Sequence, residues 1–236
     1  MNKIVNFDTT EQFNSFIQQK IGKELGFGSE GSCYSGKDGK AYKVLSFETD
    51  YVPEEIITTT DIDTEAFAFP DTLFTVDGNL VAYTSKEVSP NLFSKDFLIE
   101  QNTVEHIDFD QLIHAYHNMK EHVAFITSKK IKIDDLSFNL LYDGKSLIGC
   151  DTCSYYWDES VTLEENIELL DDAMKKSFFL FLLNNDEKYS HPTLGTSRLL
   201  DDMEKVDVED FLRYVEGKYK YKDTPKTYIN KKSSNN

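Results

Sequence analysis

The chain has 236 residues, enough for one domain or two small lobes, and 39% of them are hydrophobic, as expected for a protein with a sizeable core. Its formal net charge of -17 repels phosphate backbones, which argues against general nucleic-acid binding and favours a partner with a cationic surface. The longest apolar run, residues 178–183, is too short to cross a bilayer, and the N-terminal residues show no secretory signal, so we expect a cytoplasmic protein without a transmembrane segment.

Residues 9–21 are predicted to form an amphipathic helix. Either Thr9 or Thr10 can cap its N-terminus. Apolar side chains recur with helical spacing on one face, at Phe13, Phe16, Ile17 and Ile21.

A GxGxxG sequence follows, with glycines at Gly26, Gly28 and Gly31. Such glycines bind phosphates either where a turn opens a helix, as in dinucleotide-binding folds, or where a loop joins two strands. Here residues 32–35, a Gly-rich turn at 36–39 and residues 40–45 form a strand–turn–strand pattern. The pattern predicts a hairpin and argues against a Rossmann fold. An ordinary hairpin that contains three glycines is the alternative.

The strand after this turn carries a lysine among apolar residues. Strand periodicity places Ala41, Lys43 and Leu45 on one face. A lysine there needs a negative group to offset its loss of water, and phosphate oxygens would supply one. The alternative is a solvated strand face.

A short helix is predicted to begin near residues 53–57, where a proline precedes two acids. A second hairpin follows, with strands at 73–76 and 80–84 and an Asp-Gly turn between them. We therefore expect an antiparallel N-terminal sheet from about residue 20 to 86, with residues 85–88 as the segment that leads out of it.

The remainder is predicted to be mainly helical. Apolar side chains keep helical spacing over residues 108–127, 162–183 and 207–216, each with a capping residue at its start. From Lys218 the chain is basic and is expected to be a mobile tail. Two minor alternatives concern metal or redox chemistry: a His114–His117 metal pair, and a redox pair at Cys150-x-x-Cys153 in place of reduced cysteines.

Between the first two of these helices lies a loop rich in polar groups. Asp134 is followed five positions later by Asn139, then by a hairpin with an Asp-Gly turn at 143–144, then by Asp151. Asn and Asp oxygens are ligands that divalent metals accept. The remaining carboxylate is free to orient or deprotonate a hydroxyl. Asp135 is the alternative to Asp134, but Asp134 has the five-residue spacing to Asn139.

The order of glycine loop, lysine strand, helix, hairpin, helix, Asp-to-Asn loop, hairpin and Asp resembles the protein-kinase-like superfamily over residues 20–155. In that family the motifs are H-R-D-L-x-x-x-N followed by D-F-G. The resemblance implies an α+β, two-lobed fold with an N-lobe at 1–87, a reduced helical C-lobe at 88–217 and a tail at 218–236.

The same resemblance implies an ATP- and Mg²⁺-dependent phosphotransferase acting on a hydroxyl of a protein or small molecule. In this interpretation the amides of Gly26, Gly28 and Gly31 and the ammonium of Lys43 hold the phosphates, and Ala41 lies against the base. Asn139 and Asp151 bind the metal, and Asp134 is the catalytic base. The helix glutamate that pairs with Lys43 in the family stays open among Glu54, Glu55 and Glu65.

The chain departs from the family pattern at several positions. Lys132 and Ile133 stand where the family has His and Arg, and Thr152-Cys153 follow Asp151 in place of Phe-Gly. No A-P-E is present and the C-lobe is short. The chain is therefore interpreted as a small divergent member, with two alternatives: a pseudokinase that binds nucleotide or acts as a scaffold, and a small-molecule kinase.

Overall fold

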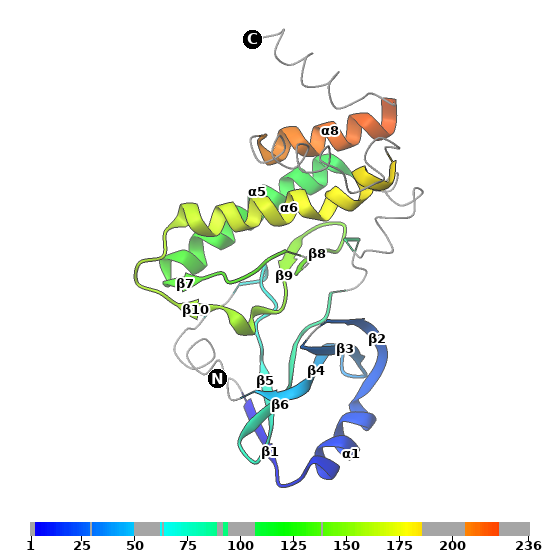
Figure 1. Cartoon of the computed structure of the whole chain (residues 1–236), viewed down its shortest axis with the longest axis vertical. Coiled ribbons are helices and arrows are strands. Elements are labelled where there is room, and N and C mark those ends of the chain that lie inside the picture. Colours follow the sequence, from blue (N-terminus) through cyan, green and yellow to red (C-terminus); the bar gives the residue numbers. More distant parts are fainter. Residues whose placement is uncertain are drawn as a thin grey trace. The chain divides into compact units, whose positions relative to one another are not determined.

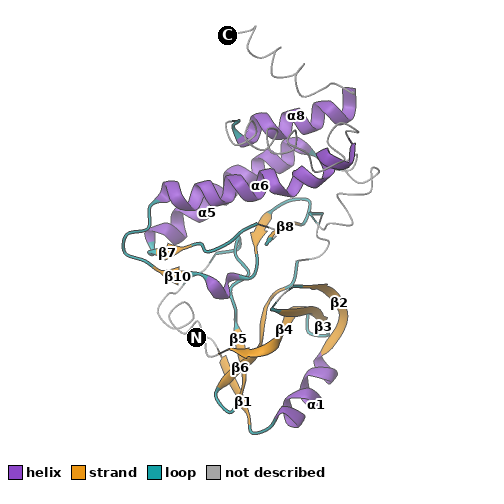
Figure 2. Cartoon of the chain, viewed as in Figure 1, coloured by secondary structure: helices purple, strands orange, loops and turns teal. Residues whose placement is uncertain are grey.

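The computed structural model describes residues 3–28, 30–49, 62, 64–88, 92–93, 107–137, 139–185 and 206–221 (Figure 1). The fold is α+β, with a six-stranded, mostly antiparallel sheet in the N-terminal part and four helices among these residues (Figure 2). The chain forms two compact units. The first comprises Met1–Ser89, Phe125–Asp135 and Ile148–Thr162, and the second comprises Pro90–Ala124, Leu136–Leu147 and Leu163–Asn236.

The sheet of the first unit has the strand order β1-β5-β6-β4-β3-β2. Its strands are β1 (Lys3–Phe7), β2 (Ile21–Phe27), β3 (Gly31–Gly36), β4 (Lys40–Thr49), β5 (Thr72–Val76) and β6 (Asn79–Lys86). Four strand pairs are antiparallel, as predicted: β2–β3, β3–β4, β4–β6 and β5–β6. The edge strand β1 was not predicted, and it pairs with β5 in parallel. The antiparallel sheet predicted from about residue 20 to 86 is confirmed, and β1 adds a parallel edge outside that range, where a long connection allows parallel pairing.

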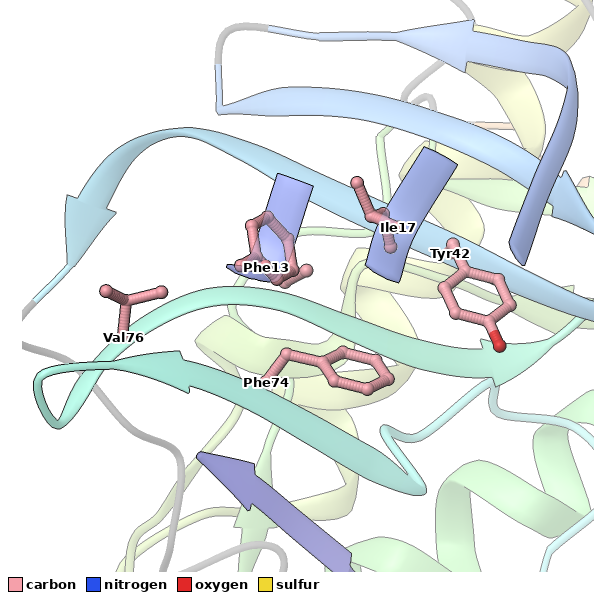
Figure 3. Packing of buried hydrophobic residues seen from close by; sticks show 6 residues of the cluster. Phe13, Ile17, Tyr42, Phe74 and Val76 are labelled. Carbon is pink, nitrogen blue, oxygen red and sulfur yellow. The ribbon is translucent and has the colours of Figure 1, made fainter. Parts of the chain in front are cut away.

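Helix α1 (Thr10–Lys20) confirms the first predicted helix. The Thr9 hydroxyl caps it by accepting a hydrogen bond from the Gln12 amide at 3.3 Å. Its buried side chains pack on one face of the sheet, in a cluster of Phe13, Ile17, Tyr42, Phe74, Val76 and Ala82 (Figure 3). The helix ends one residue earlier than predicted, because Ile21 is extended and begins β2.

The turns of the sheet follow from their sequences. Asp77 and Gly78 join β5 to β6 with φ values of 50° and 82°, the left-handed pair that a tight two-residue hairpin requires. Gly39, at φ 78°, closes the turn between β3 and β4. Both hairpins predicted within this sheet are confirmed.

The first unit also contains later segments of the chain. Strand β7 (Ile131–Lys132) pairs antiparallel with β10 (Tyr156–Trp157). The end of β9 (Leu147–Gly149) lies beside residues 66–68, where the Gly149 amide donates to the Ala66 carbonyl and the Ala68 amide donates to the Gly149 carbonyl, both at 2.8 Å. A short 3-10 helix, η1 (Thr152–Ser154), follows. These contacts place Asp151 in the same unit as the sheet.

The second unit contains α5 (Phe109–Ser128, except its last turn), α6 (Leu163–Asn185), α8 (Val208–Tyr221) and β8 (Leu140–Tyr142). The Phe178 ring on α6 packs against Phe93 and Phe109, with centroids 5.4 and 6.0 Å apart. The Arg213 guanidinium on α8 binds the Asp110 carboxylate on α5 at 2.5 Å. The three predicted helices are confirmed, although α8 continues to Tyr221, beyond residue 216.

Two expectations lie outside the described residues. They are the helix start at 53–57, with Glu54 and Glu55, and residues 222–236 of the basic tail predicted from Lys218. The prediction of a tail is wrong at residues 218–221, which are the last turn of α8.

Candidate functional site

Lys43 extends from the face of β4 opposite to α1. Its neighbours Tyr42 and Val44 pack in the α1 cluster, whereas Leu45 packs against the separate cluster of Leu73, Leu80 and Tyr83. The predicted alternation of Ala41, Lys43 and Leu45 on one face is therefore confirmed. The Lys43 side chain is only 14% exposed, so its charge needs a partner.

Two carboxylates surround the Lys43 ammonium. It contacts Oδ1 of Asp151 and lies 3.0 Å from Oε2 of Glu30. The Tyr83 hydroxyl donates to the same Asp151 oxygen at 3.0 Å, and the Tyr83 ring lies 5.9 Å from the ammonium. The expected proximity of Lys43 and Asp151, which are 108 positions apart in the sequence, is confirmed.

Glu30 as a partner of Lys43 was not predicted. Sequence reasoning considered only acids that follow the lysine, although Glu30 lies inside the GxGxxG sequence itself and was available as a signal. Of the acids that were considered, Glu65 is described, and its backbone carbonyl accepts a hydrogen bond from Lys86 at 3.4 Å.

These contacts determine the protonation of Lys43. Burial by itself lowers the pKa of the ammonium, but the hydrogen bonds and charges of Asp151 and Glu30 outweigh it and raise the pKa above its ordinary value. Lys43 is therefore a fixed positive charge at neutral pH.

Asp151 has a left-handed backbone, and one of its two carboxylate oxygens accepts its side-chain hydrogen bonds. Its φ of 56° and ψ of 44° are left-handed, which costs a non-glycine residue about 1 kcal/mol. Both of its side-chain bonds fall on Oδ1, and none from the described residues falls on Oδ2. Its side chain is 29% exposed. One carboxylate oxygen is therefore available to a ligand.

The glycines of the GxGxxG sequence differ in their roles. A Cβ on Gly31 would lie 2.1 Å from the Val44 carbonyl oxygen, so close packing of β3 on β4 requires glycine there. A Cβ on Gly26 or Gly28 would meet no atom of the described residues within 4 Å. Packing thus accounts for Gly31, whereas Gly26 and Gly28 face open space where a ligand could approach the backbone.

All three cysteines lie near this ion pair and are free thiols. Cys33 is the strand partner of Lys43 in the β3–β4 register, and Cys150 and Cys153 flank Asp151 in sequence. Burial raises the pKa of Cys150 and of Cys153 to about 12. Since the thiolate is the reactive form, this environment disfavours the redox-pair interpretation.

The remaining predicted residues are divided between the two units. Asp134 follows β7 in the first unit and is exposed. Asn139 is half-buried in the second unit, where its backbone amide donates to the Leu136 carbonyl at 3.0 Å. A common site for Asn139 and Asp151 stays a prediction.

A buried tyrosine lies close to the acids of the first unit. The Tyr155 hydroxyl is fully buried and has no hydrogen-bond partner among the described residues. Burial raises its pKa well above the ordinary value, and the charges of Asp135, Asp151 and Asp134 raise it further. Sequence reasoning did not select this residue.

His114 and His117 on α5, the pair considered as metal ligands, have ordinary partners. His114 lies 3.3 Å from the Asn118 amide nitrogen, and His117 lies 3.4 Å from Glu209. Within the described parts of the chain, no three His, Cys, Asp or Glu side chains are grouped to hold a metal ion.

Comparison of the sequence with protein-family models gives no match, and neither does a search of curated proteins. None of the helices in the described ranges combines the length and the apolar character needed to cross a membrane.

Proposed function

We propose that this chain is an ATP-dependent phosphotransferase with a two-lobed, protein-kinase-like fold, which moves the γ-phosphoryl group to a hydroxyl acceptor. The observation that carries the proposal is the Lys43–Asp151 contact. It joins strand β4 to Asp151, which follows the hairpin with the turn at 143–144, and the kinase resemblance assigns both residues to one nucleotide site.

The residues fit Mg²⁺ in the chemistry of their donors. Asp151 retains a free carboxylate oxygen, and the Asn139 side chain supplies a neutral amide oxygen. Magnesium commonly takes one or two protein oxygens and fills its other positions with water and substrate phosphates. When bound, it would neutralise charge on the transferred phosphoryl group.

The other residues then have distinct tasks. Lys43 would bind phosphate oxygens as a fixed positive charge, and the open backbone at Gly26 and Gly28 would lie over the phosphates, with Ala41 against the base. Asp134, exposed beyond β7, would orient the acceptor hydroxyl and accept its proton. Positioning and charge stabilisation account for most of such catalysis.

A pseudokinase is the second candidate, and one observation favours it. Lys43 already has two carboxylate partners in this structure, so its charge is offset without a nucleotide. The Thr152-Cys153 sequence, which follows Asp151 in place of the family's Phe-Gly, also favours a pseudokinase. Because the helical C-lobe is reduced relative to the kinase pattern, the acceptor is either a protein or a small molecule.

The test separates binding from turnover. Thermal stabilisation by ATP, with and without Mg²⁺, measures binding, and release or transfer of labelled γ-phosphate to water or to the chain itself measures turnover. Asp151→Ala should abolish Mg²⁺-dependent turnover. Asp134→Asn should slow turnover by about a hundredfold while the stabilisation by ATP persists.

Asp135→Asn tests the alternative assignment of the catalytic base, because Asp135 is the adjacent exposed acid. It should behave like the wild type. Binding without turnover in every variant would replace the kinase proposal with the pseudokinase, and no stabilisation by ATP would overturn both.

A further inference from the structure

The Glu30 side chain reaches from the glycine loop to the Lys43 ammonium. Their charged atoms are 3.0 Å apart, within the range of a charge-assisted hydrogen bond. An ammonium has three N–H donors, and Glu30 and Asp151 occupy two of them. The carboxylate of Glu30 therefore occupies a direction from which an anionic ligand of Lys43 could approach.

The two carboxylates on Lys43 are held very differently. Asp151 is fixed by its left-handed backbone and by the Tyr83 hydroxyl, and its side chain is 29% exposed. The Glu30 side chain is 54% exposed, and Lys43 is its one side-chain partner among the described residues. Glu30 is thus the partner that can leave at small cost.

The backbone of Glu30 does not depend on its side chain. Its carbonyl oxygen accepts a hydrogen bond from the Ser46 amide at 2.8 Å, and the neighbouring Gly28 amide donates to the Gly31 carbonyl at 2.9 Å. The side chain can therefore rotate away from Lys43 while these bonds keep the hairpin closed.

A polyphosphate at Lys43 would meet the Glu30 carboxylate directly. Two anions that share one ammonium repel each other, and the low exposure of Lys43 limits the screening of that repulsion by water. The ligand must therefore displace Glu30 or bind weakly.

We propose that Glu30 sets the affinity of this site for polyphosphates, because its carboxylate occupies Lys43 in the free protein and must leave when the phosphates of a nucleotide bind. This inference rests on the proposed nucleotide site and adds a residue that weakens binding there. Glu30 is a specificity-determining residue with no part in the chemical step.

Calorimetric titration of inorganic tripolyphosphate and of ATP into the whole chain tests this inference. Glu30→Gln keeps the size of the side chain and removes its charge, and should tighten binding of both ligands by roughly three- to tenfold. Glu24→Gln is the matched control. Glu24 is exposed on β2 of the same hairpin, and its replacement changes the net charge equally without touching Lys43.

The outcomes separate this inference from the proposed function. Tighter binding in Glu30→Gln but not in Glu24→Gln supports the inference, whether or not phosphate is transferred. Equal affinities in wild type and Glu30→Gln, or equal tightening in both variants, overturn it and leave the nucleotide site standing. Absence of binding to all three proteins overturns both.

Discussion

The strength of the Lys43–Asp151 pair can be measured by a double-mutant cycle. Lys43→Met keeps an apolar stem and removes the ammonium, and Asp151→Asn keeps the shape of the carboxylate and removes its charge. The two side chains are 14% and 29% exposed, so the pair lies between a surface pair, worth up to about 1 kcal/mol, and a buried pair, where loss of one partner costs about 3–5 kcal/mol. We expect a coupling free energy of about 2 kcal/mol.

Strand β4 provides an internal control. Lys40 and Asp71 form an ion pair at 2.8 Å, with both side chains 42% exposed. The same cycle with Lys40→Met and Asp71→Asn should give a coupling below about 1 kcal/mol, because water screens this pair. The comparison holds the strand and the type of substitution constant and changes the burial.

The assay is urea unfolding followed by tryptophan fluorescence. Trp157 is the chain's one tryptophan and belongs to the first unit, so its signal reports on the unit that contains both ion pairs. A coupling for Lys43–Asp151 no larger than that for Lys40–Asp71 would refute the reasoning. In that case the contact would be a surface ion pair without energetic consequence.

Two further predictions concern the same strands. Gly31→Ala should destabilise the first unit by about 2–4 kcal/mol, because its Cβ would meet the Val44 carbonyl oxygen, whereas Gly26→Ala should change the free energy of unfolding by less than about 0.5 kcal/mol. Equal effects in urea unfolding would contradict the packing role of Gly31. The folded-state pKa of Lys43 is raised above 10.5, so its contribution to stability should be complete below pH 10.5 and decline as the pH rises through the folded-state value. A Lys43–Asp151 coupling that already declines between pH 7 and 9 would count against this.

Local features of the fold were predictable from sequence. The Asp77-Gly78 turn and the face of α1 formed by Phe13 and Ile17 depend on neighbours close in sequence, and both are confirmed. Strand β1 was missed because it has only five residues and three of them are exposed. Its strand character depends on pairing with β5, whose residues lie far along the chain.

The site was predictable where a resemblance ordered distant residues. The proximity of Lys43 and Asp151 followed from the order of motifs, but their direct contact and the second partner, Glu30 from the glycine loop, did not. The sequence alone does not distinguish among four glutamates as the partner of Lys43: Glu30, Glu54, Glu55 and Glu65. The three-dimensional path of the β2–β3 loop brings Glu30 to the ammonium. The role of Gly31 could not be predicted from sequence either. A phosphate-binding motif and a tight strand contact both require glycine, and the structure shows the strand contact.

Asp151 supports a ligand at this site more strongly than Lys43 does. A buried lysine needs a negative partner, and the protein supplies two, so the cost of burying Lys43 is met without phosphate. That cost does not explain why Asp151 adopts a strained, left-handed backbone or why only one of its oxygens is bonded. Strain of this kind persists where surrounding contacts enforce it, and it is common at functional sites. In the proposed function, a cation or its hydration water would occupy the free oxygen, and Glu30 would be the group that the phosphates displace.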